Sequence, residues 1–196
     1  MKLFYSPTSP YVRKVMACAM ATGVQGQITK VQTNPWESPA ELLAQNPLSK
    51  VPCLVTDDGV ALFGSPVICE YLDSIGAGAI FPPAGPLRWR ALKLQAIGDG
   101  LMDAAILRRQ EQGRPTEPAR QTAMDRYLAA VTRALDALEQ DPPLDHVDIG
   151  AITVACALGY LDFRFSHEDW RMNRPQLAKW YEAIGRRAEI AETAPA

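Results

Sequence analysis

The fold is decided around one stretch of sequence, Asn46-Pro47-Leu48-Ser49-Lys50-Val51-Pro52-Cys53-Leu54-Val55. Pro52 opens a short strand, and the Asp58-Gly59 pair that follows is typical of a tight hairpin turn. Ala61 to Phe63 then forms the returning strand. A proline before a strand is often cis where it also shapes a binding site. The stretch therefore predicts an antiparallel hairpin that leaves the backbone of Val51 free at its entrance.

Upstream of this hairpin, the pattern predicts two strands on either side of a helix. Residues 3–5 read as a buried strand, and residues 28–32 as a second one. Ser9 is a good N-cap and Pro10 a good first helical residue, while Gly23 ends the helix. The expected buried face of this helix consists of Val12, Val15, Met16 and Ala19. Strands that flank a helix in this way are expected to be parallel.

Two further helices complete the N-terminal pattern. Ser38 to Glu41 has the sequence of a capping box and predicts a short helix through residues 42–43. Ser65-Pro66 begins another helix, which Gly76 ends. Its expected face consists of Ile68, Tyr71, Leu72 and Ile75. The order β-α-β-α-β-β-α predicts an α/β thioredoxin-like domain over residues 1–77.

The composition changes after this domain, which predicts a linker over residues 78–86 and an all-helical domain over residues 87–196. The expected helix faces are Leu94, Ile97, Leu101 and Ala105; Leu128, Val131, Leu135 and Leu138; and Leu177, Trp180, Tyr181 and Ile184. An apolar helix at 149–161 is expected to begin with Asp145 as its N-cap, Asp148 three residues on, and a staple between Leu144 and Ile149.

The composition excludes several classes of protein. Of 196 residues, 47% are hydrophobic, and 20 basic residues nearly balance 22 acidic ones, which gives no reason to expect a nucleic-acid or membrane partner. No apolar run is long enough for a signal peptide or a membrane span, so a cytoplasmic location is expected. The four cysteines are isolated and predict buried, reduced thiols, and the two histidines are isolated as well, so no metal site is expected.

Ser9 is the candidate with the most favourable position for chemistry. It follows the first strand, and ligands of open α/β sheets bind at the carboxyl ends of strands. The helix that begins at Pro10 directs its amides and its dipole toward that point, where they stabilise an anion. A thiol has a pKa of about 8.5, which a hydroxyl donor and a helix N-terminus could lower by roughly one to two units.

Two other places suit the ends of a small peptide. Ser65 and the amides after it could hold a carboxylate, and the free backbone of Val51 could pair with an extended peptide. A small cysteine-containing peptide fits all three places. The alternative is that Ser9, Ser38 and Ser65, each followed by proline, are only helix caps.

Four segments resemble the glutathione S-transferase family. They are the opening residues 5–14, the stretch 46–54, the helix start at 63–72 and the Asp145–Asp148 cap, and together they span essentially the whole chain. The stretch 46–54 is the most specific, because it is similar to the family's Asn-Pro-x-Gly-Lys-Val-Pro-x-Leu segment. The resemblance implies a thioredoxin-like domain, a helical domain, glutathione as substrate without a metal, and a homodimer.

The resemblance also implies roles for individual residues. Ser9 would hydrogen-bond the glutathione sulfur, with Thr8, Tyr5 or a main-chain amide as alternatives. The remaining contacts with glutathione would come from Lys50 at the glycyl carboxylate, Val51 before a cis Pro52 at the cysteinyl backbone, and Gly64 and Ser65 at the γ-glutamyl end. A small hydrophobic electrophile would lie between the domains, against the helix that contains Asp99, Met102 and Asp103.

The sequence departs from the family pattern in three places. Gly64 stands where a carboxylate usually precedes the serine, and Asp99 or Asp103, from this or a partner chain, could substitute unless both are simply solvated. Ser49 replaces the usual glycine. No cysteine lies near Ser9, because Cys18 is more than two turns into the helix, which argues against thiol exchange through a protein cysteine.

These features favour a transferase that activates the thiol of glutathione for attack on a small electrophile. The alternatives are a non-catalytic glutathione-binding or protein-interaction module and a glutathione-dependent peroxidase or dehalogenase. The aromatic and charged stretch 163–170 could be a partner surface, but inward-packed aromatics at a helix end are the more ordinary interpretation.

Overall fold

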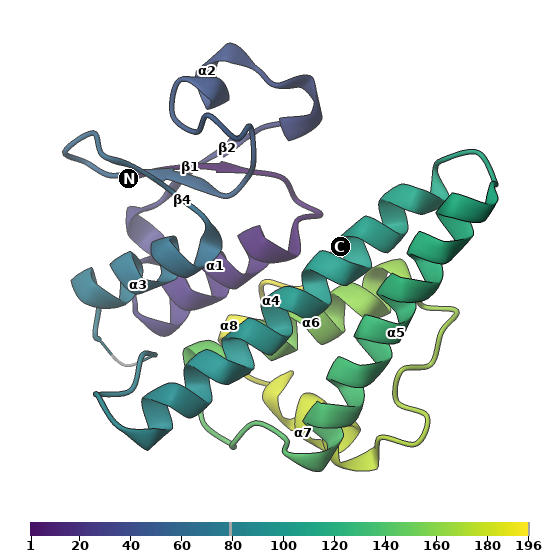
Figure 1. The fold of residues 1–196 in the computed structure, drawn as a ribbon. Coiled ribbons are helices and arrows are strands. Elements are labelled where there is room, and N and C mark those ends of the chain that lie inside the picture. Colours follow the sequence, from purple (N-terminus) through teal and green to yellow (C-terminus); the bar gives the residue numbers. More distant parts are fainter. Residues whose placement is uncertain (79, 196) are drawn as a thin grey trace.

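A four-stranded mixed sheet forms the N-terminal part of the computed structural model, which describes residues 1–78 and 80–195 (Figure 1). The strands are β1 (Lys2–Tyr5), β2 (Thr29–Gln32), β3 (Cys53–Val55) and β4 (Ala61–Phe63), in the order β2-β1-β3-β4. β1 is parallel to β2, and β3 is antiparallel to both β1 and β4. The predicted parallel pair and hairpin are therefore confirmed.

The two faces of the sheet are covered by different helices, as Figure 1 shows. α1 (Pro10–Ala21) and α3 (Ser65–Ile75) pack together on one face, and the short α2 (Ala40–Leu43) lies on the other. Side chains alternate along a strand, so Leu3 of β1 joins the core with α1 and α3 while its neighbour Phe4 packs with Leu42 of α2. This is the predicted element order, with two short 3₁₀ turns added, η1 (Gln25–Gln27) and η2 (Pro35–Glu37).

The C-terminal part is helical throughout its described residues. It consists of α4 (Pro86–Gln112), α5 (Pro118–Gln140), α6 (Ile149–Arg164), α7 (Pro175–Ile184) and α8 (Ala188–Ala191). α6 is buried on every side from its first residue to Leu161, because its sequence is apolar all round. The predicted fold class, a thioredoxin-like part followed by helices, is confirmed; the division at residues 77, 78–86 and 87 stays a prediction.

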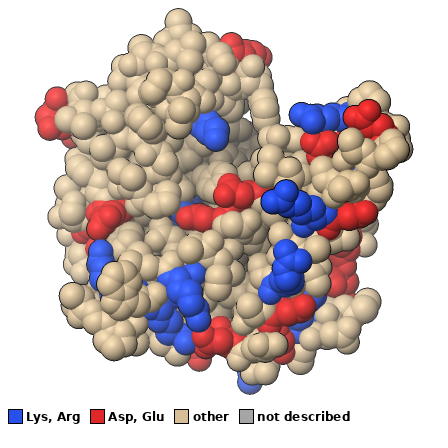
Figure 2. Space-filling model, viewed as in Figure 1, with Lys and Arg blue, Asp and Glu red and all other residues tan. Residues whose placement is uncertain are grey.

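The sheet part and the helical part share one core. α1 packs against α6 and α8 as well as α3, and one cluster of buried apolar side chains runs from Leu3 to Ile190. Figure 2 shows the face of Figure 1 hollowed between the sheet part and the helices, with acidic and basic side chains around the hollow. Across the described residues, no helix is both long and apolar enough to cross a membrane.

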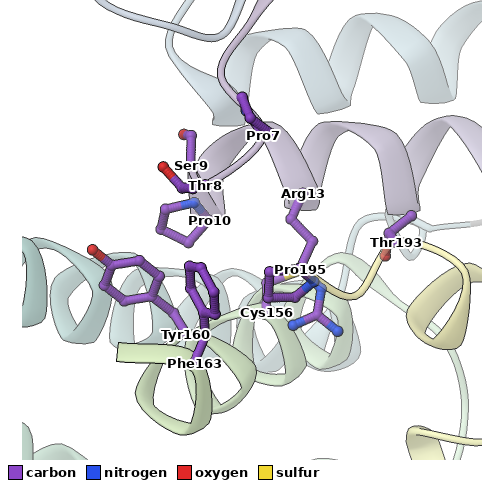
Figure 3. A pocket seen from close by; sticks show the side chains of 10 residues that line it. All are labelled: Pro7, Thr8, Ser9, Pro10, Arg13, Cys156, Tyr160, Phe163, Thr193 and Pro195. Atoms are coloured by element: carbon purple, nitrogen blue, oxygen red, sulfur yellow. The ribbon is translucent and has the colours of Figure 1, made fainter. Parts of the chain in front are cut away.

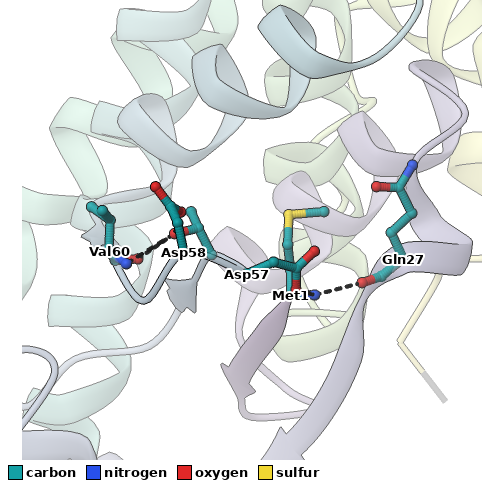
Figure 4. A network of polar contacts seen from close by, with 6 residues as sticks. Met1, Gln27, Asp57, Asp58 and Val60 are labelled. Carbon is teal, nitrogen blue, oxygen red and sulfur yellow. Dashed lines mark hydrogen bonds and ion pairs between the residues drawn. The ribbon is translucent and has the colours of Figure 1, made fainter.

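The end of the sheet where β1 begins is fixed by polar contacts (Figure 4). The amino group of Met1 donates to the carbonyl of Gln27 at 2.9 Å and pairs with Asp57 at 2.6 Å. In the adjoining turn, the amide of Val60 donates to Thr56 Oγ1 at 2.9 Å. These contacts occupy this end of the sheet, and the candidate site lies at the opposite end.

Two predicted helix caps are wrong. Ser38 has a φ of 46° and ends η2, while Pro39 precedes α2 with an extended backbone and without a capping side chain. Asp148, and not Asp145, is the N-cap of α6, since its carboxylate accepts a hydrogen bond from the amide of Ala151 at 2.8 Å. Leu144, expected in a staple with Ile149, is 43% exposed. Before α2 the left-handed backbone of Ser38 ends the preceding turn, so no side chain caps α2; before α6 the chain offers two aspartates, and the extended backbone at Asp148 makes that one the cap.

Candidate functional site

The strand register brings the three predicted peptide-binding places to one end of the sheet. Ser9 follows β1, whose residue Phe4 is paired with Cys53 at the start of β3. Cys53 is paired in turn with Phe63 at the end of β4. The end of β1, the start of β3 and the end of β4 therefore lie side by side, and so do the segments that contain Ser9, Val51 and Ser65.

Ser9 lies where its hydroxyl can serve two purposes. It is the N-cap of α1, and its Oγ accepts a hydrogen bond from the amide of Val12 at 3.3 Å. A hydroxyl has one donor and two lone pairs, so this contact leaves its O–H free to donate. The side chain is only partly buried and therefore accessible. A thiolate beside it would receive a hydrogen bond and the favourable end of the helix dipole.

The alternatives to Ser9 differ in their surroundings. Thr8 is exposed, and Tyr5 is partly buried against the core. The main-chain amide of Ser9 already donates to the carbonyl of Ser6 at 3.2 Å, the amide of Val12 is bonded to Ser9 Oγ, and Pro10 has no N–H. At the start of α1 these contacts leave the hydroxyl of Ser9 as a donor, together with the main-chain amide of Tyr11.

The loop before β3 is organised by Asn46, which is 1% exposed. Its Nδ2 donates to the carbonyl of Lys50 at 2.8 Å, and its Oδ1 accepts from the amide of Leu48 at 3.0 Å. Ser49 takes the left-handed conformation, with a φ of 49°, and its Oγ donates to the carbonyl of Pro35 at 3.1 Å. Ser49 thus has the backbone that a glycine would adopt easily, and the departure from the family pattern leaves the loop intact.

The end of this loop carries the predicted peptide-pairing position. The Val51–Pro52 bond is cis, as expected from the sequence. Val51 is partly exposed, whereas Pro52 is buried, and the side chain of Lys50 is exposed. The backbone of Val51 is therefore placed at the rim of the sheet.

The start of α3 offers amides for an anion. Gly64 is the N-cap with a φ of 82°, a conformation that favours glycine, and nothing lies within 4 Å of the position that a side chain would take. Ser65 is the first helical residue and is 4% exposed. No side chain caps this helix among the described residues, so its first amides are available to a ligand carboxylate.

Asp99 and Asp103 of α4 contact α1 rather than standing free in solvent. Asp99 Oδ1 lies 2.6 Å from Nζ of the buried Lys14, and burial raises the pKa of Asp99 while Lys14 lowers it by less. Tyr11 donates its hydroxyl to Asp103, and burial followed by this contact raises the pKa of Tyr11. Met102 is fully buried in α4, and its predicted position behind the ligand or against a partner chain stays a prediction.

A pocket opens beside Ser9, between α1, α6 and the end of the chain (Figure 3). Its cavity volume is about 20 Å³, and the space around it, open solvent included, is about 240 Å³. The residues that line it are Pro7, Thr8, Ser9, Pro10, Arg13, Cys156, Tyr160, Phe163, Thr193 and Pro195. In Figure 3 the rings of Tyr160 and Phe163 lie below Pro10, and Arg13 extends toward Cys156 and Pro195.

Sequence reasoning missed most of this pocket. Arg13 is one helical turn beyond Ser9, and that spacing was the one local signal available. Tyr160, Phe163, Thr193 and Pro195 come from the far end of the chain, where no motif pointed to them.

The cysteines are placed for packing rather than for chemistry. All four are free and buried. Burial raises the pKa of Cys156, which lies at the pocket, to about 11, and burial also raises the pKa of Cys18. A thiol with a raised pKa is a poor nucleophile at neutral pH. The described residues also contain no group of three His, Cys, Asp or Glu side chains that could hold a metal ion.

Comparison with known proteins adds two family matches. A model described as the N-terminal domain of glutathione S-transferase matches residues 8–75, and one described as the C-terminal domain matches residues 121–183. The chain is 36% identical over its whole length to the uncharacterized GST-like protein YibF of Escherichia coli (strain K12), 98% of which is covered.

Solved structures with ligands are similar along the whole chain. A glutathione transferase family member from Pseudomonas fluorescens Pf-5, with bound glutathione, is 41% identical, with a TM-score of 0.93 over 100% of this chain and 98% of that chain. A structure of a family member from the same organism, with bound S-(propanoic acid)-glutathione, is 39% identical, with a TM-score of 0.87 over 100% of both chains.

Proposed function

This chain belongs to the glutathione S-transferase family, and from that premise we propose that it binds glutathione and activates its thiol beside Ser9. The observation that carries the proposal is the Ser9 hydroxyl, which caps α1 and keeps a free O–H at the carboxyl end of β1. Similar proteins that hold glutathione in their structures support the choice of ligand.

The bound tripeptide would lie along the end of the sheet. Its cysteinyl backbone would pair with Val51, its γ-glutamyl carboxylate would receive the first amides of α3 at Ser65, and Lys50 would approach the glycyl carboxylate. The thiol would then lie over the N-terminus of α1. No metal is needed for this arrangement, because each contact is made by protein groups.

The chemistry proposed is that of a glutathione transferase. Ser9 donates a hydrogen bond to the thiolate, which lowers the pKa of the thiol toward neutrality. The thiolate sulfur then attacks the electrophilic atom of a second substrate, a carbon–sulfur bond forms, and the leaving group departs with its electron pair. The protein orients the two reactants, which contributes to the rate by itself.

The electrophile would occupy the pocket formed with Tyr160 and Phe163, next to Ser9. A family member that is 39% identical holds a glutathione with a substituent on its sulfur, S-(propanoic acid)-glutathione, and this supports the presence of room beside the sulfur in this chain. The α4 residues Asp99 and Asp103 remain near the start of α1 but are engaged with Lys14 and Tyr11.

A second candidate function is glutathione binding without turnover. The observation that favours it is Gly64, which provides no carboxylate for the γ-glutamyl amino group. A third possibility is a peroxidase reaction at the same thiolate. Activity assays with a panel of electrophiles and hydroperoxides distinguish a transferase, a peroxidase and a protein that binds glutathione without turnover.

A homodimer is proposed as well. An exposed apolar surface could form the contact between two subunits. It consists of Phe63 at the end of β4, Val67 in α3 and Trp89 near the start of α4. Light scattering coupled to size-exclusion chromatography gives the mass directly, and a monomer at micromolar concentration contradicts this proposal.

The decisive experiment compares wild type with Ser9→Ala and Ser9→Thr. Glutathione is titrated by calorimetry, and the ultraviolet absorbance of the bound thiolate is followed against pH. All three proteins are expected to bind glutathione, with thiolate formation near neutral pH in wild type and Ser9→Thr only. If Ser9→Ala gives the same thiolate signal as wild type, Thr8 or a main-chain amide activates the thiol instead of Ser9. If wild type does not bind millimolar glutathione, glutathione is not the ligand.

A further inference from the structure

We propose that the second substrate carries a carboxylate and that Arg13 binds it. This inference rests on the proposed function and narrows the sequence-based expectation of a simple hydrophobic electrophile. It follows from the position of Arg13, from its burial, and from the charges around the pocket.

Arg13 lies one helical turn beyond Ser9 on the same side of α1. Its amide donates to the carbonyl of Ser9 at 3.1 Å, and residues four apart on a helix are neighbours on its surface, with about 5–6 Å between their Cβ atoms. Both residues line the pocket, and Figure 3 shows the Arg13 side chain directed along it, toward Pro195. A group attached to a sulfur at Ser9 therefore enters the same pocket that Arg13 lines.

The charge of Arg13 is buried, and no Asp or Glu among the described residues pairs with it. Its side chain is 9% exposed, and its Nη2 donates to the carbonyl of Ile190 at 3.1 Å. Nε and Nη1 are both buried and make no hydrogen bond of good geometry in the described part of the chain, and the uncharged hydroxyl of Tyr181 is the polar group beside the guanidinium. A guanidinium is always charged, so this arrangement carries a large desolvation cost that an anion would offset.

The other buried basic side chains make the contrast clear. Lys14 is paired with Asp99 at 2.6 Å, and Arg108 is paired with Glu168 through two hydrogen bonds. Across residues 1–78 and 80–195, only Arg13 among these buried cations has no carboxylate partner. Within the part of the chain that the structure describes, Lys14 and Arg108 thus have a carboxylate partner and Arg13, at the pocket, has none.

The rest of the pocket favours the same ligand. Its described lining contains no Asp or Glu, and it offers the hydroxyl groups of Thr8, Ser9, Tyr160 and Thr193. Burial raises the pKa of Tyr160, and Arg164 and Arg109 lower it by less, so two more cations lie near this part of the pocket. Phe163 and the prolines supply apolar walls. A short, partly apolar group that ends in a carboxylate matches this combination.

The guanidinium of Arg13 occupies a space that exists because residue 159 is a glycine. A Cβ added to Gly159 would lie 2.0 Å from Arg13 Nη1 and 2.9 Å from the hydroxyl of Tyr181, so the absence of a side chain at Gly159 makes room for the charge. A substitution there displaces the flexible end of Arg13 without removing its charge. Gly159→Ala therefore tests the position of the charge, and Arg13→Met tests its presence.

The experiment compares two glutathione conjugates of nearly equal shape. S-(2-carboxyethyl)glutathione ends in a carboxylate and S-(2-carbamoylethyl)glutathione ends in a neutral amide. Their affinities are measured by calorimetry at neutral pH, with glutathione itself as the reference. Wild type is expected to prefer the carboxylate by about 10-fold to 100-fold, the range of a charge-assisted hydrogen bond.

The variants separate recognition from a merely structural role. Arg13→Met is expected to lose the preference and to bind glutathione within about twofold of wild type. Gly159→Ala is expected to reduce the preference, and it serves in place of Arg13→Met if that variant does not fold. Arg133→Met, which removes an exposed charge from α5, is the control and is expected to retain the preference.

Two results overturn the inference while leaving glutathione binding intact. One is equal affinity of wild type for the carboxylate and the amide, and the other is a preference that survives Arg13→Met. Failure of wild type to bind glutathione at all overturns the proposed function and this inference with it.

Discussion

Lys14 of α1 and Asp99 of α4 form an ion pair, with 2.6 Å between Nζ and Oδ1, in which the lysine side chain is fully buried. One turn further along α4, Asp103 accepts a hydrogen bond from the hydroxyl of Tyr11. These contacts join the helix that carries Ser9 to the longest helix of the C-terminal part. They therefore fix the start of α1, and with it the candidate site, relative to the pocket walls.

Breaking this ion pair from the side of Lys14 is expected to destabilise the protein. In Lys14→Met the largely buried carboxylate of Asp99 keeps its desolvation cost and loses its partner, which costs about 3–5 kcal/mol in buried pairs of this kind. Urea unfolding followed by circular dichroism gives the change in the free energy of unfolding. Asp103→Asn is the control, because its carboxylate is exposed and a neutral amide still accepts from Tyr11; its expected cost is below about 1.5 kcal/mol. Equal costs for the two variants would contradict the prediction.

The pH dependence of stability is expected to depend on two carboxylates in opposite ways. Burial raises the folded-state pKa of Asp99 above its unfolded value, so its contribution to stability is full below about pH 3.9 and is lost as the pH rises through the folded pKa. The hydrogen bond from Arg108 lowers the pKa of Glu168. Its contribution is present above about pH 4.3 and is lost as the pH falls through the folded pKa.

Unfolding measured between about pH 3 and pH 6 tests both signs. Acidification is expected to lower the free energy of unfolding of Glu168→Gln less than that of wild type, because the substitution removes a group whose stabilising contribution is lost in acid. It is expected to weaken Asp99→Asn more than wild type, because a group that gains stability in acid has been removed. If the two variants change the slope of the free energy of unfolding against pH in the same direction, the pKa direction assigned to Asp99 or to Glu168 is wrong.

Local patterns were sufficient for the strands of the sheet and the helices around it, and for the parallel pair and the hairpin. Hydrophobic periodicity, the positions of the prolines and the Asp58-Gly59 turn act over a few residues. They were enough to predict strands 53–55 and 61–63 and the start of α1 at Pro10. The register then places Ser9, Val51 and Ser65 at one end of the sheet, as the thioredoxin-like order requires.

The rest depends on contacts between distant residues, which no local pattern encodes. Arg13 is bonded to Ile190, and Lys14 to Asp99, across long stretches of sequence. The family resemblance pointed to Met102, but the packing of α4 buries it, while Tyr160 and Phe163 form the pocket instead. Tertiary packing decides which face of a long helix is covered, and the motif alone does not.

The capping of α6 provides a direct comparison of two nearby aspartates. Asp148 is 7% exposed and its carboxylate accepts from the amide of Ala151, so Asp148→Ala is expected to cost about 1–2 kcal/mol. Asp145 is exposed and lies before the cap, so Asp145→Ala is expected to change stability by less than about 0.5 kcal/mol. Thermal unfolding of both variants measures the difference. A larger effect at Asp145 would restore the capping position expected from the sequence.

Asn46 is expected to support glutathione binding without touching the ligand. Its amide group holds the carbonyl of Lys50 and the amide of Leu48, and it is 1% exposed, so Asn46→Ala leaves buried backbone groups without partners. The expected cost is about 1–3 kcal/mol of stability. Because the loop carries Val51, the affinity for glutathione is expected to fall as well, while the pKa of the bound thiol stays unchanged, since Ser9 belongs to α1.

Calorimetry and thiolate absorbance on the same variant separate these effects. Asn34→Ala is the matched control, because Asn34 also caps a turn, η2, through the amide of Trp36 but is exposed. It is expected to leave the affinity for glutathione near that of wild type. If Asn46→Ala changes the pKa of the bound thiol, the loop before β3 acts on the sulfur directly. The assignment of thiol activation to α1 and of peptide binding to this loop would then be wrong.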